Sequence, residues 1–153
     1  MDKQAIITFG IPGSGKSYWA KNYVGSNESN WVEINLDDCR KAICGDEGNQ
    51  KVTSDAVKLR DLIMDKSIRE NKNIIVSDTN LNRKFRNELV KKLTDFGYDV
   101  SIKVFDVDFE TCKQRNNDRA RVVPHNAMIR MWEHFLNEIN HVKENENNIS
   151  NRL

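Results

Sequence analysis

The sequence predicts an α/β fold in which a parallel sheet is covered by helices on both faces. Short continuous apolar runs alternate with segments that are apolar on one helical face, a pattern typical of such a sheet. The 153 residues suit one hydrophobic core, and 38% hydrophobic with 31% charged residues is the composition of a folded globular chain. Ligands of these sheets bind at the carboxyl ends of the strands, so the loops after the apolar runs are the places to search for function.

Four apolar runs rich in Ile, Val and Phe predict the strands, and Gly, Asn or Asp bounds each of them. They are residues 5–9, 31–34, 74–77 and 100–105. Helical spacing predicts two of the intervening helices, whose apolar faces are Val52, Ala56, Leu59 and Ile63, and then Phe85, Leu89, Leu93 and Phe96. Asn82 is the expected N-cap of the second of these helices, and Gly97 is expected to end it.

A last helix is predicted after Pro124, a residue that suits the first turn of a helix. Its apolar stripe is expected to lie in the core and consists of Met128, Met131, Trp132, Phe135, Ile139 and Val142. The polar tail at residues 143–153 is expected to fray. No repeat or long linker divides the chain, so residues 1–153 are predicted to form a single domain.

Charge, cysteine content and hydropathy exclude several classes of protein. The formal net charge of +1 gives no global attraction to nucleic acid, so a polyanion would have to be bound by a local basic patch. Cys39, Cys44 and Cys112 show no C-x-x-C spacing, and we expect reduced, buried thiols rather than disulfides or a zinc site. The first apolar run is too short to span a membrane and lacks a signal-peptide pattern, which favours a cytoplasmic protein without a membrane partner.

Residues 10–17, Gly-Ile-Pro-Gly-Ser-Gly-Lys-Ser, match the phosphate-binding pattern G-x-x-x-x-G-K-[ST]. The match follows the first predicted strand and opens a helical segment, which is the context that a P-loop requires. Its glycines allow backbone amides to turn toward phosphates, Lys16 can neutralise the transferred group, and the Ser17 hydroxyl can ligate Mg²⁺. We therefore predict a nucleoside triphosphate and Mg²⁺ here; a simple glycine-rich turn would need neither Lys16 nor Ser17.

The loop after the second strand places an acid and a guanidinium together. Asp37 and Arg40 are three residues apart at the start of a short helical stretch, so they share a helix face. Asp37 is the candidate general base for an acceptor hydroxyl, and Arg40 could hold a substrate phosphate. The alternatives are that Asp37 or Asp38 caps the helix and that Arg40 is a solvated surface residue.

Two further segments could complete a phosphotransfer site. Asp78 follows the third strand, where P-loop enzymes commonly keep an acid near Mg²⁺; the alternative is an aspartate whose side chain caps a turn. Residues 113–121 carry four basic residues and one acid. Arg115 and Arg119 are four apart and could close over the triphosphate, so residues 113–123 are predicted to act as a lid; the alternative is a solvated charged helix end.

Five motifs, taken in order, resemble the kinase module of phage polynucleotide 5′-hydroxyl kinases. They are residues 9–20, 34–40, 77–82 and 103–107, and the group formed by Arg115, Asn116, Arg119, Val123 and Pro124. The resemblance covers nearly the whole chain. It implies a three-layer, adenylate-kinase-like P-loop NTPase fold with four parallel strands, and transfer of the γ-phosphate of ATP to the 5′-OH end of DNA or RNA in end repair.

The resemblance also implies roles for individual residues. Asp37 would be the general base, Arg40 would contact the phosphate 3′ to the acceptor sugar, and Arg119 would lie nearest the transferred phosphate. The catalytic residues would be Asp37, Lys16 and Arg119, and the ATP-binding residues Gly13, Ser14, Gly15, Lys16, Ser17, Tyr18, Arg115 and Arg119. The acceptor would contact Asp37, Arg40, Asp78 and Thr79, and Mg²⁺ would be held by Ser17 and Asp78.

Two departures from the family pattern leave other functions open. Leu36 stands where the family often has a basic residue, and Cys39 replaces a common aromatic residue, so the grip on the acceptor is expected to differ. The phosphatase domain that often follows the kinase is missing from this sequence, which predicts a kinase without 3′-phosphatase activity. The alternatives are a P-loop kinase of a small molecule, such as a nucleoside, nucleotide or antibiotic, and a nucleotide-dependent switch; an oligomer is possible.

Overall fold

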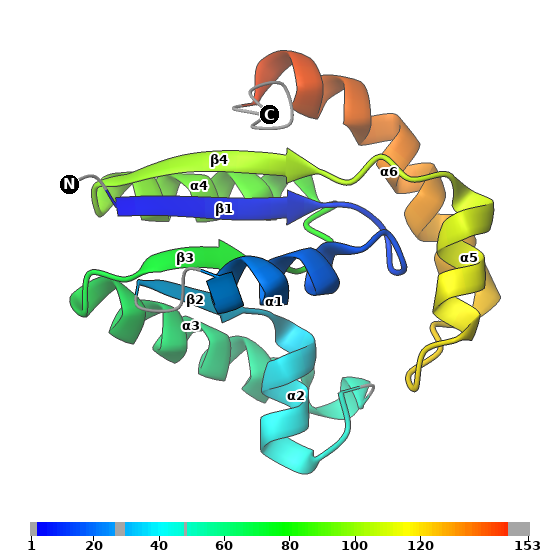
Figure 1. Cartoon of the computed structure of the whole chain (residues 1–153), viewed down its shortest axis with the longest axis horizontal. Helices are drawn as coiled ribbons and strands as arrows, with labels where there is room; N and C mark the ends of the chain where they lie inside the picture. Colours follow the sequence, from blue (N-terminus) through cyan, green and yellow to red (C-terminus); the bar gives the residue numbers. More distant parts are fainter. Residues whose placement is uncertain (1–2, 27–29, 48, 147–153) are drawn as a thin grey trace.

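The computed structural model describes residues 3–26, 30–47 and 49–146 and shows a four-stranded, fully parallel sheet in the order β2-β3-β1-β4 (Figure 1). The strands are β1 (Lys3–Phe9), β2 (Trp31–Ile34), β3 (Asn73–Val76) and β4 (Tyr98–Val104). The helices are α1 (Lys16–Ser26), α2 (Leu36–Cys44), the 3-10 turn η1 (Gln50–Val52), α3 (Thr53–Arg69), α4 (Arg83–Asp95), α5 (Phe109–Asn117) and α6 (His125–Asn145). The predicted sheet and its four strands are confirmed.

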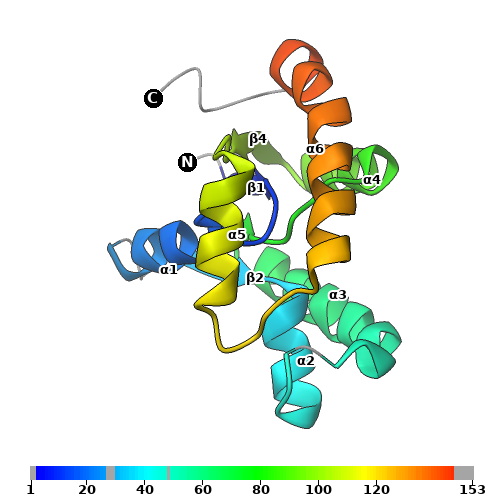
Figure 2. The same ribbon diagram turned by 90° about the vertical axis from the view of Figure 1, so that its right-hand side faces the viewer.

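Helices cover both faces of the sheet, because side chains of successive strand residues point to opposite faces. In β1, Ala5, Ile7 and Phe9 are fully buried on the face that packs against α3, α4 and α6. Ile6 lies on the other face, in a smaller cluster with Trp31 and residues of α1. The strands all point toward α5 and α6, which lie beyond their carboxyl ends (Figures 1 and 2).

The start of α2 is capped by an asparagine. Asn35 has an extended backbone, and its side-chain oxygen accepts a hydrogen bond from the backbone N–H of Asp38 at 2.7 Å. The suggested capping by Asp37 or Asp38 is therefore wrong, because Asn35 already occupies the capping position and satisfies that orphan donor. Asp37 lies in the first turn of α2 instead, and its carboxylate is available for other contacts.

Helix α4 shows both a success and an error of the sequence prediction. Asn82 caps it by accepting from the N–H of Phe85 at 3.0 Å, and Gly97 follows with φ of 88°, a left-handed conformation that suits glycine. Phe85 and Phe96, however, are 66% and 53% exposed. The inward position is taken by Arg86, whose buried guanidinium donates to the backbone carbonyls of residues 80 and 81 and pairs with two glutamates near the end of α6.

Helix α6 confirms the predicted apolar stripe. Met128, Phe135, Ile139 and Val142 are buried, while Met131 and Trp132 are partly buried against the same core. Pro124 immediately precedes the helix instead of lying in its first turn, since its ψ of 144° is extended.

The predicted fraying of the tail is wrong at its beginning. Helix α6 continues to Asn145, and the Glu146 carboxylate pairs with Arg86 at 2.8 Å. The rest of the predicted tail, residues 147–153, lies outside the described residues.

The three cysteines are free thiols, but only two fit the prediction. Cys39 and Cys112 are buried, whereas Cys44 is exposed because it lies on the outer face at the end of α2. Within the described part of the chain, no helix is long and apolar enough to cross a membrane.

Candidate functional site

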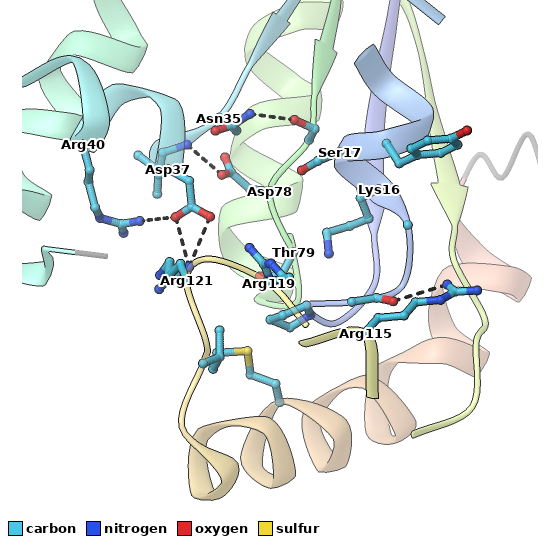
Figure 3. Close-up of a pocket in the computed structure, with 18 residues that line it drawn as sticks. Lys16, Ser17, Asn35, Asp37, Arg40, Asp78, Thr79, Arg115, Arg119 and Arg121 are labelled. Carbon is cyan, nitrogen blue, oxygen red and sulfur yellow. Dashed lines mark hydrogen bonds and ion pairs between the residues drawn. The ribbon is translucent and has the colours of Figure 1, made fainter. Parts of the chain in front are cut away.

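A pocket of about 460 Å³ opens at the carboxyl ends of β1, β2 and β3. Its walls come from the loop between β1 and α1, the start of α2, the loop after β3, and the segment between α5 and α6 (Figure 3). Every residue predicted for the site lines this pocket except Ser14. The fold therefore brings together four sequence segments that the motif analysis could only consider separately.

At two positions, the backbone of the phosphate-binding loop has a left-handed conformation that favours glycine. Gly13 and Gly15 have φ values of 85° and 99°. A Cβ added at Gly13 would lie 2.3 Å from the backbone carbonyl oxygen of Cys112, so α5 packs directly on the loop. Ser14 is buried, and its Oγ has no hydrogen-bond partner among the described residues. The loop is thus fixed from outside by α5.

Lys16, the first residue of α1, is held in the pocket with little access to solvent. Its Nζ donates to the backbone carbonyl of Ile11 at 2.8 Å, and the residue is 7% exposed. Burial, and next to it the positive charge of Arg119, lower the pKa of Lys16 to about 8. An anion in the pocket would offset both effects, so the electrostatics of this loop fit a phosphate group.

Asp37 and Arg40 meet as their spacing predicted. The Nη1 of Arg40 donates to Oδ1 of Asp37 at 2.7 Å, a short charge-assisted hydrogen bond between the first and second turns of α2. The side chain of Arg40 is only 9% exposed, whereas that of Asp37 is 34% exposed and faces the pocket. Arg40 therefore fixes the orientation of a carboxylate that a ligand can still reach.

Asp78 lines the pocket beside the start of α2, and only one of its two carboxylate oxygens has a hydrogen-bond partner among the described residues. Its Oδ1 accepts from the backbone N–H of Leu36 at 2.8 Å, while its Oδ2 is buried with no partner among the described residues. Burial raises the pKa of Asp78. A buried orphan oxygen, with the hydroxyl of Ser17 on the same side of the pocket, is a donor set that fits a hydrated Mg²⁺ (Figure 3).

No group of three or more His, Cys, Asp or Glu in the described ranges could hold a metal without further ligands. Thr79 contributes backbone to the same region, since its carbonyl accepts from the N–H of Gly10 at 3.2 Å. Tyr18 lines the rim of the pocket and is 79% exposed.

Three arginines from the end of α5 and from the segment between α5 and α6 line the pocket. Arg115 donates from Nη1 to the carbonyl of Gly13 at 3.3 Å, and Arg119 lines the pocket near enough to Lys16 to affect its pKa. Arg121 reaches the other side, where its Nη1 contacts both carboxylate oxygens of Asp37. Helix α5 and the segment after it therefore contact both the phosphate-binding loop and α2, and the lid role of residues 113–123 stays a prediction.

Arg121 is the residue that the sequence prediction missed. It belongs to the basic run that drew attention to this segment, but no spacing rule connects it to Asp37, which lies 84 residues earlier. Only the packing of α5 and α6 across the ends of the strands shows which arginine of the run meets that carboxylate.

Comparison with known proteins places this geometry in a family. The family model AAA_33, described as an AAA domain, matches residues 6–139. The chain belongs to this family. The likeness to polynucleotide kinases stated from the motifs is also confirmed: a protein of Autographa californica nuclear polyhedrosis virus, named as a bifunctional polynucleotide kinase/RNA ligase, is 28% identical over 154 residues. That match covers 88% of this chain and 21% of the viral protein, so the chain spans about a fifth of its relative.

Solved structures show the same fold. A chain from the Pnkp1/Rnl/Hen1 RNA repair complex is 25% identical, with a TM-score of 0.79 over 92% of this chain and 46% of that one. A gluconokinase from Sinorhizobium meliloti is 17% identical, with a TM-score of 0.56 over 86% of this chain and 74% of that chain, which shows the fold alone. The predicted P-loop kinase fold is confirmed, and this member of the AAA_33 family is a kinase-like domain.

Proposed function

We propose that the protein is a polynucleotide 5′-hydroxyl kinase that transfers the γ-phosphate of ATP to the 5′-OH end of DNA or RNA, in nucleic-acid end repair. The observation that carries the proposal is the position of Asp37. Its carboxylate, oriented by Arg40, faces the same pocket as Lys16 of the phosphate-binding loop. A potential base and a triphosphate cradle thus share one cavity, as transfer to a hydroxyl requires.

On the donor side, the triphosphate of ATP would lie on the backbone amides of the phosphate-binding loop. Lys16 and Arg119 would bind the phosphate that is transferred, and Arg115 would contact the donor phosphates from the lid. Ser17 and Asp78 would hold Mg²⁺, which when bound supplies positive charge that offsets the negative charge of the triphosphate.

On the acceptor side, Asp37 would take the proton of the 5′-hydroxyl while the oxygen of that hydroxyl forms a bond to the γ-phosphorus. The bond between the γ-phosphorus and the bridging oxygen breaks, and ADP leaves with that electron pair. The products are a 5′-phosphorylated end, ADP and a proton on Asp37 that passes to solvent. Arg40 would hold the phosphate 3′ to the acceptor sugar, which brings the hydroxyl into line.

The names of the relatives support nucleic acid as the acceptor, and the departure at Leu36 supports the alternative of a small-molecule kinase. Leu36 lies directly before the base and lines the pocket, so the family's frequent basic contact is absent at that position. The two acceptors differ in one testable way: a polynucleotide kinase gains from the phosphate 3′ to the reacting sugar, and a nucleoside kinase does not.

The deciding experiment offers γ-labelled ATP and Mg²⁺ with four acceptors: a 5′-OH DNA oligonucleotide, the matching RNA, a nucleoside 3′-monophosphate and a nucleoside. A 5′-phosphorylated oligonucleotide is the control. Labelling of the oligonucleotides, with a kcat/KM for the nucleoside 3′-monophosphate at least tenfold above that of the nucleoside, is the expected result. The nucleoside as best acceptor would replace the proposal by a small-molecule kinase, and tight ATP binding without labelling would favour a switch.

The lack of 3′-phosphatase activity stays a prediction. It is tested with the same oligonucleotide carrying a 3′-phosphate, whose loss would be measured as released inorganic phosphate.

A further inference from the structure

Asp37 lies between two guanidinium groups that come from distant parts of the chain (Figure 3). Arg40 donates to its Oδ1 at 2.7 Å, and Arg121 donates from one nitrogen to Oδ1 at 3.3 Å and to Oδ2 at 3.2 Å. Oδ1 thus receives two donors and Oδ2 one. A hydroxyl that is to give its proton to Asp37 must therefore compete with one of these arginines.

Geometry indicates which arginine yields. The Arg40 contact has the length of a good charge-assisted hydrogen bond, and Arg40 is anchored in α2 with its side chain 9% exposed. The Arg121 contacts are longer, and its side chain is 24% exposed. Arg121 also lies in the irregular segment between α5 and α6, where no helical hydrogen bonds fix the backbone. The Arg121 pair is the weaker of the two and is the one that an entering acceptor would break.

A guanidinium that loses its carboxylate needs another anion, because an unpaired charge in a partly buried site is costly. Arg121 lines the pocket on the same side as Arg40, so the nearest anion that an acceptor strand could bring is its own backbone phosphate. A bare nucleoside brings none. The two classes of acceptor would therefore differ in what they offer to Arg121 when they displace it.

We propose that Arg121 is a specificity-determining residue: it covers Asp37 in the empty pocket and moves onto the phosphate 3′ to the reacting hydroxyl when the acceptor enters. This inference rests on the proposed function and adds a second arginine to the acceptor site. The inference gives these arginines different functions: Arg115 contacts the phosphate-binding loop, and Arg121 binds the acceptor. Arg121 thereby favours acceptors that carry a phosphate over those that do not.

The test is Arg121→Gln, which removes the charge and keeps a polar side chain. The kcat/KM for a nucleoside 3′-monophosphate should fall about tenfold or more, the loss expected for a charged hydrogen bond to a phosphate. The kcat/KM for the bare nucleoside should stay the same or rise, since the nucleoside no longer has to displace a charged group from Asp37, and the KM for ATP should stay within about twofold. Arg130→Gln is the matched control, because Arg130 is exposed on α6 and does not line the pocket.

The outcomes separate this inference from the proposed function. Equal losses with both acceptors would show a structural role, and a higher KM for ATP would show a donor role. Either result, or no change in either quantity, overturns the inference about Arg121. Labelling of nucleic acid by the wild type would still uphold the proposed kinase activity. Wild type that labels no nucleic-acid acceptor overturns both. If Arg121→Gln does not fold, Arg121→Met decides, because methionine fills similar space without a charge or a strong hydrogen-bond donor: a discrimination between the two acceptors equal to that of wild type overturns the inference.

Discussion

In the proposed kinase site, most of the donor side is one continuous stretch of backbone, whereas the acceptor side is assembled from side chains of separate segments. Residues 10–17 supply most of the proposed donor side, with two glycines in left-handed conformations and one lysine, and Arg115 and Arg119 join it from another segment. The proposed acceptor side takes Asp37 from α2, Asp78 from the loop after β3, and Arg121 from the segment between α5 and α6. A continuous backbone site can be recognised as a motif, but a site made of distant side chains depends on the fold to exist.

The comparison predicts that substitutions on the two sides fail in different ways. A change on the acceptor side should lower the rate of transfer and leave ATP binding intact, because no donor contact is removed. A change on the donor side should affect the loop itself, and with it both ATP binding and the stability of the fold around α5.

Asp37→Asn should give the largest effect. Asparagine keeps the size and a hydrogen-bonding oxygen but cannot accept the acceptor's proton, so kcat with a 5′-OH oligonucleotide should fall about 10² to 10⁴-fold. The Kd for ATP, measured by titration calorimetry, should stay within about twofold.

Asp38→Asn is the matched control for that variant. Asp38 is the neighbouring residue of α2, its side chain is 52% exposed, and it does not line the pocket. Its kcat should stay within about twofold of wild type, as is usual for an exposed side chain. A loss of ATP binding in Asp37→Asn, or equal losses of rate in both variants, would contradict the division into two sides.

Gly13→Ala should show the donor side's dependence on backbone. The new Cβ would lie 2.3 Å from the carbonyl oxygen of Cys112, at a φ of 85° that alanine rarely adopts. Strain and overpacking together should lower the free energy of unfolding by about 2 to 4 kcal/mol in urea titrations, and ATP affinity should fall as well.

Gly25→Ala provides the comparison, in the helix that follows the loop. Gly25 lies in α1, and nothing is within 4 Å of a Cβ added there, so alanine should raise the free energy of unfolding by about 0.5 to 1 kcal/mol. Wild-type stability and ATP affinity in Gly13→Ala would show that α5 does not fix the loop.

The same division explains how much could be predicted from the sequence. Continuous apolar runs predicted the strands, and the phosphate-binding motif predicted the donor side, because each pattern consists of residues that are adjacent in the sequence. Asp37 and Arg40 could be paired since they share one helix. Arg121 could not be joined to Asp37, because six elements separate the two residues in the chain and only the way these elements pack brings them into contact.

The errors have related physical causes. Helical periodicity placed Phe85 in the core, but Arg86 is buried instead, since its guanidinium is fully engaged by carbonyls and by Glu138 and Glu146. Glu138 lies in another helix and Glu146 lies just after it, so the periodicity of α4 alone cannot predict these contacts. The cap of α2 was sought among the aspartates, whereas Asn35 provides it one residue before the helix.

The smallest of the expected effects concerns the protonation of Lys16 and tests whether the donor side is poised for an anion. The pKa of Lys16 is lowered to about 8 in the empty pocket, by burial first and then by Arg119. A bound triphosphate favours the charged lysine and raises its pKa again, so ATP binding should take up protons above about pH 8. If only the charged form binds well, the Kd for ATP should rise about tenfold from pH 7 to pH 9.

Lys16→Met removes this titration and should flatten the dependence of the ATP Kd on pH over that range. The sign for stability follows from the same shift. The unfolded chain holds the Lys16 proton more tightly than the folded chain, so the charged lysine destabilises the empty protein below about pH 8, and this cost disappears as the pH approaches 10.5. Lys16→Met should therefore be more stable than wild type at pH 7 and should lose that advantage by about pH 10. An advantage that grows with pH would mean that Lys16 is stabilised as a cation in the empty loop, and that the loop is not poised to receive phosphate.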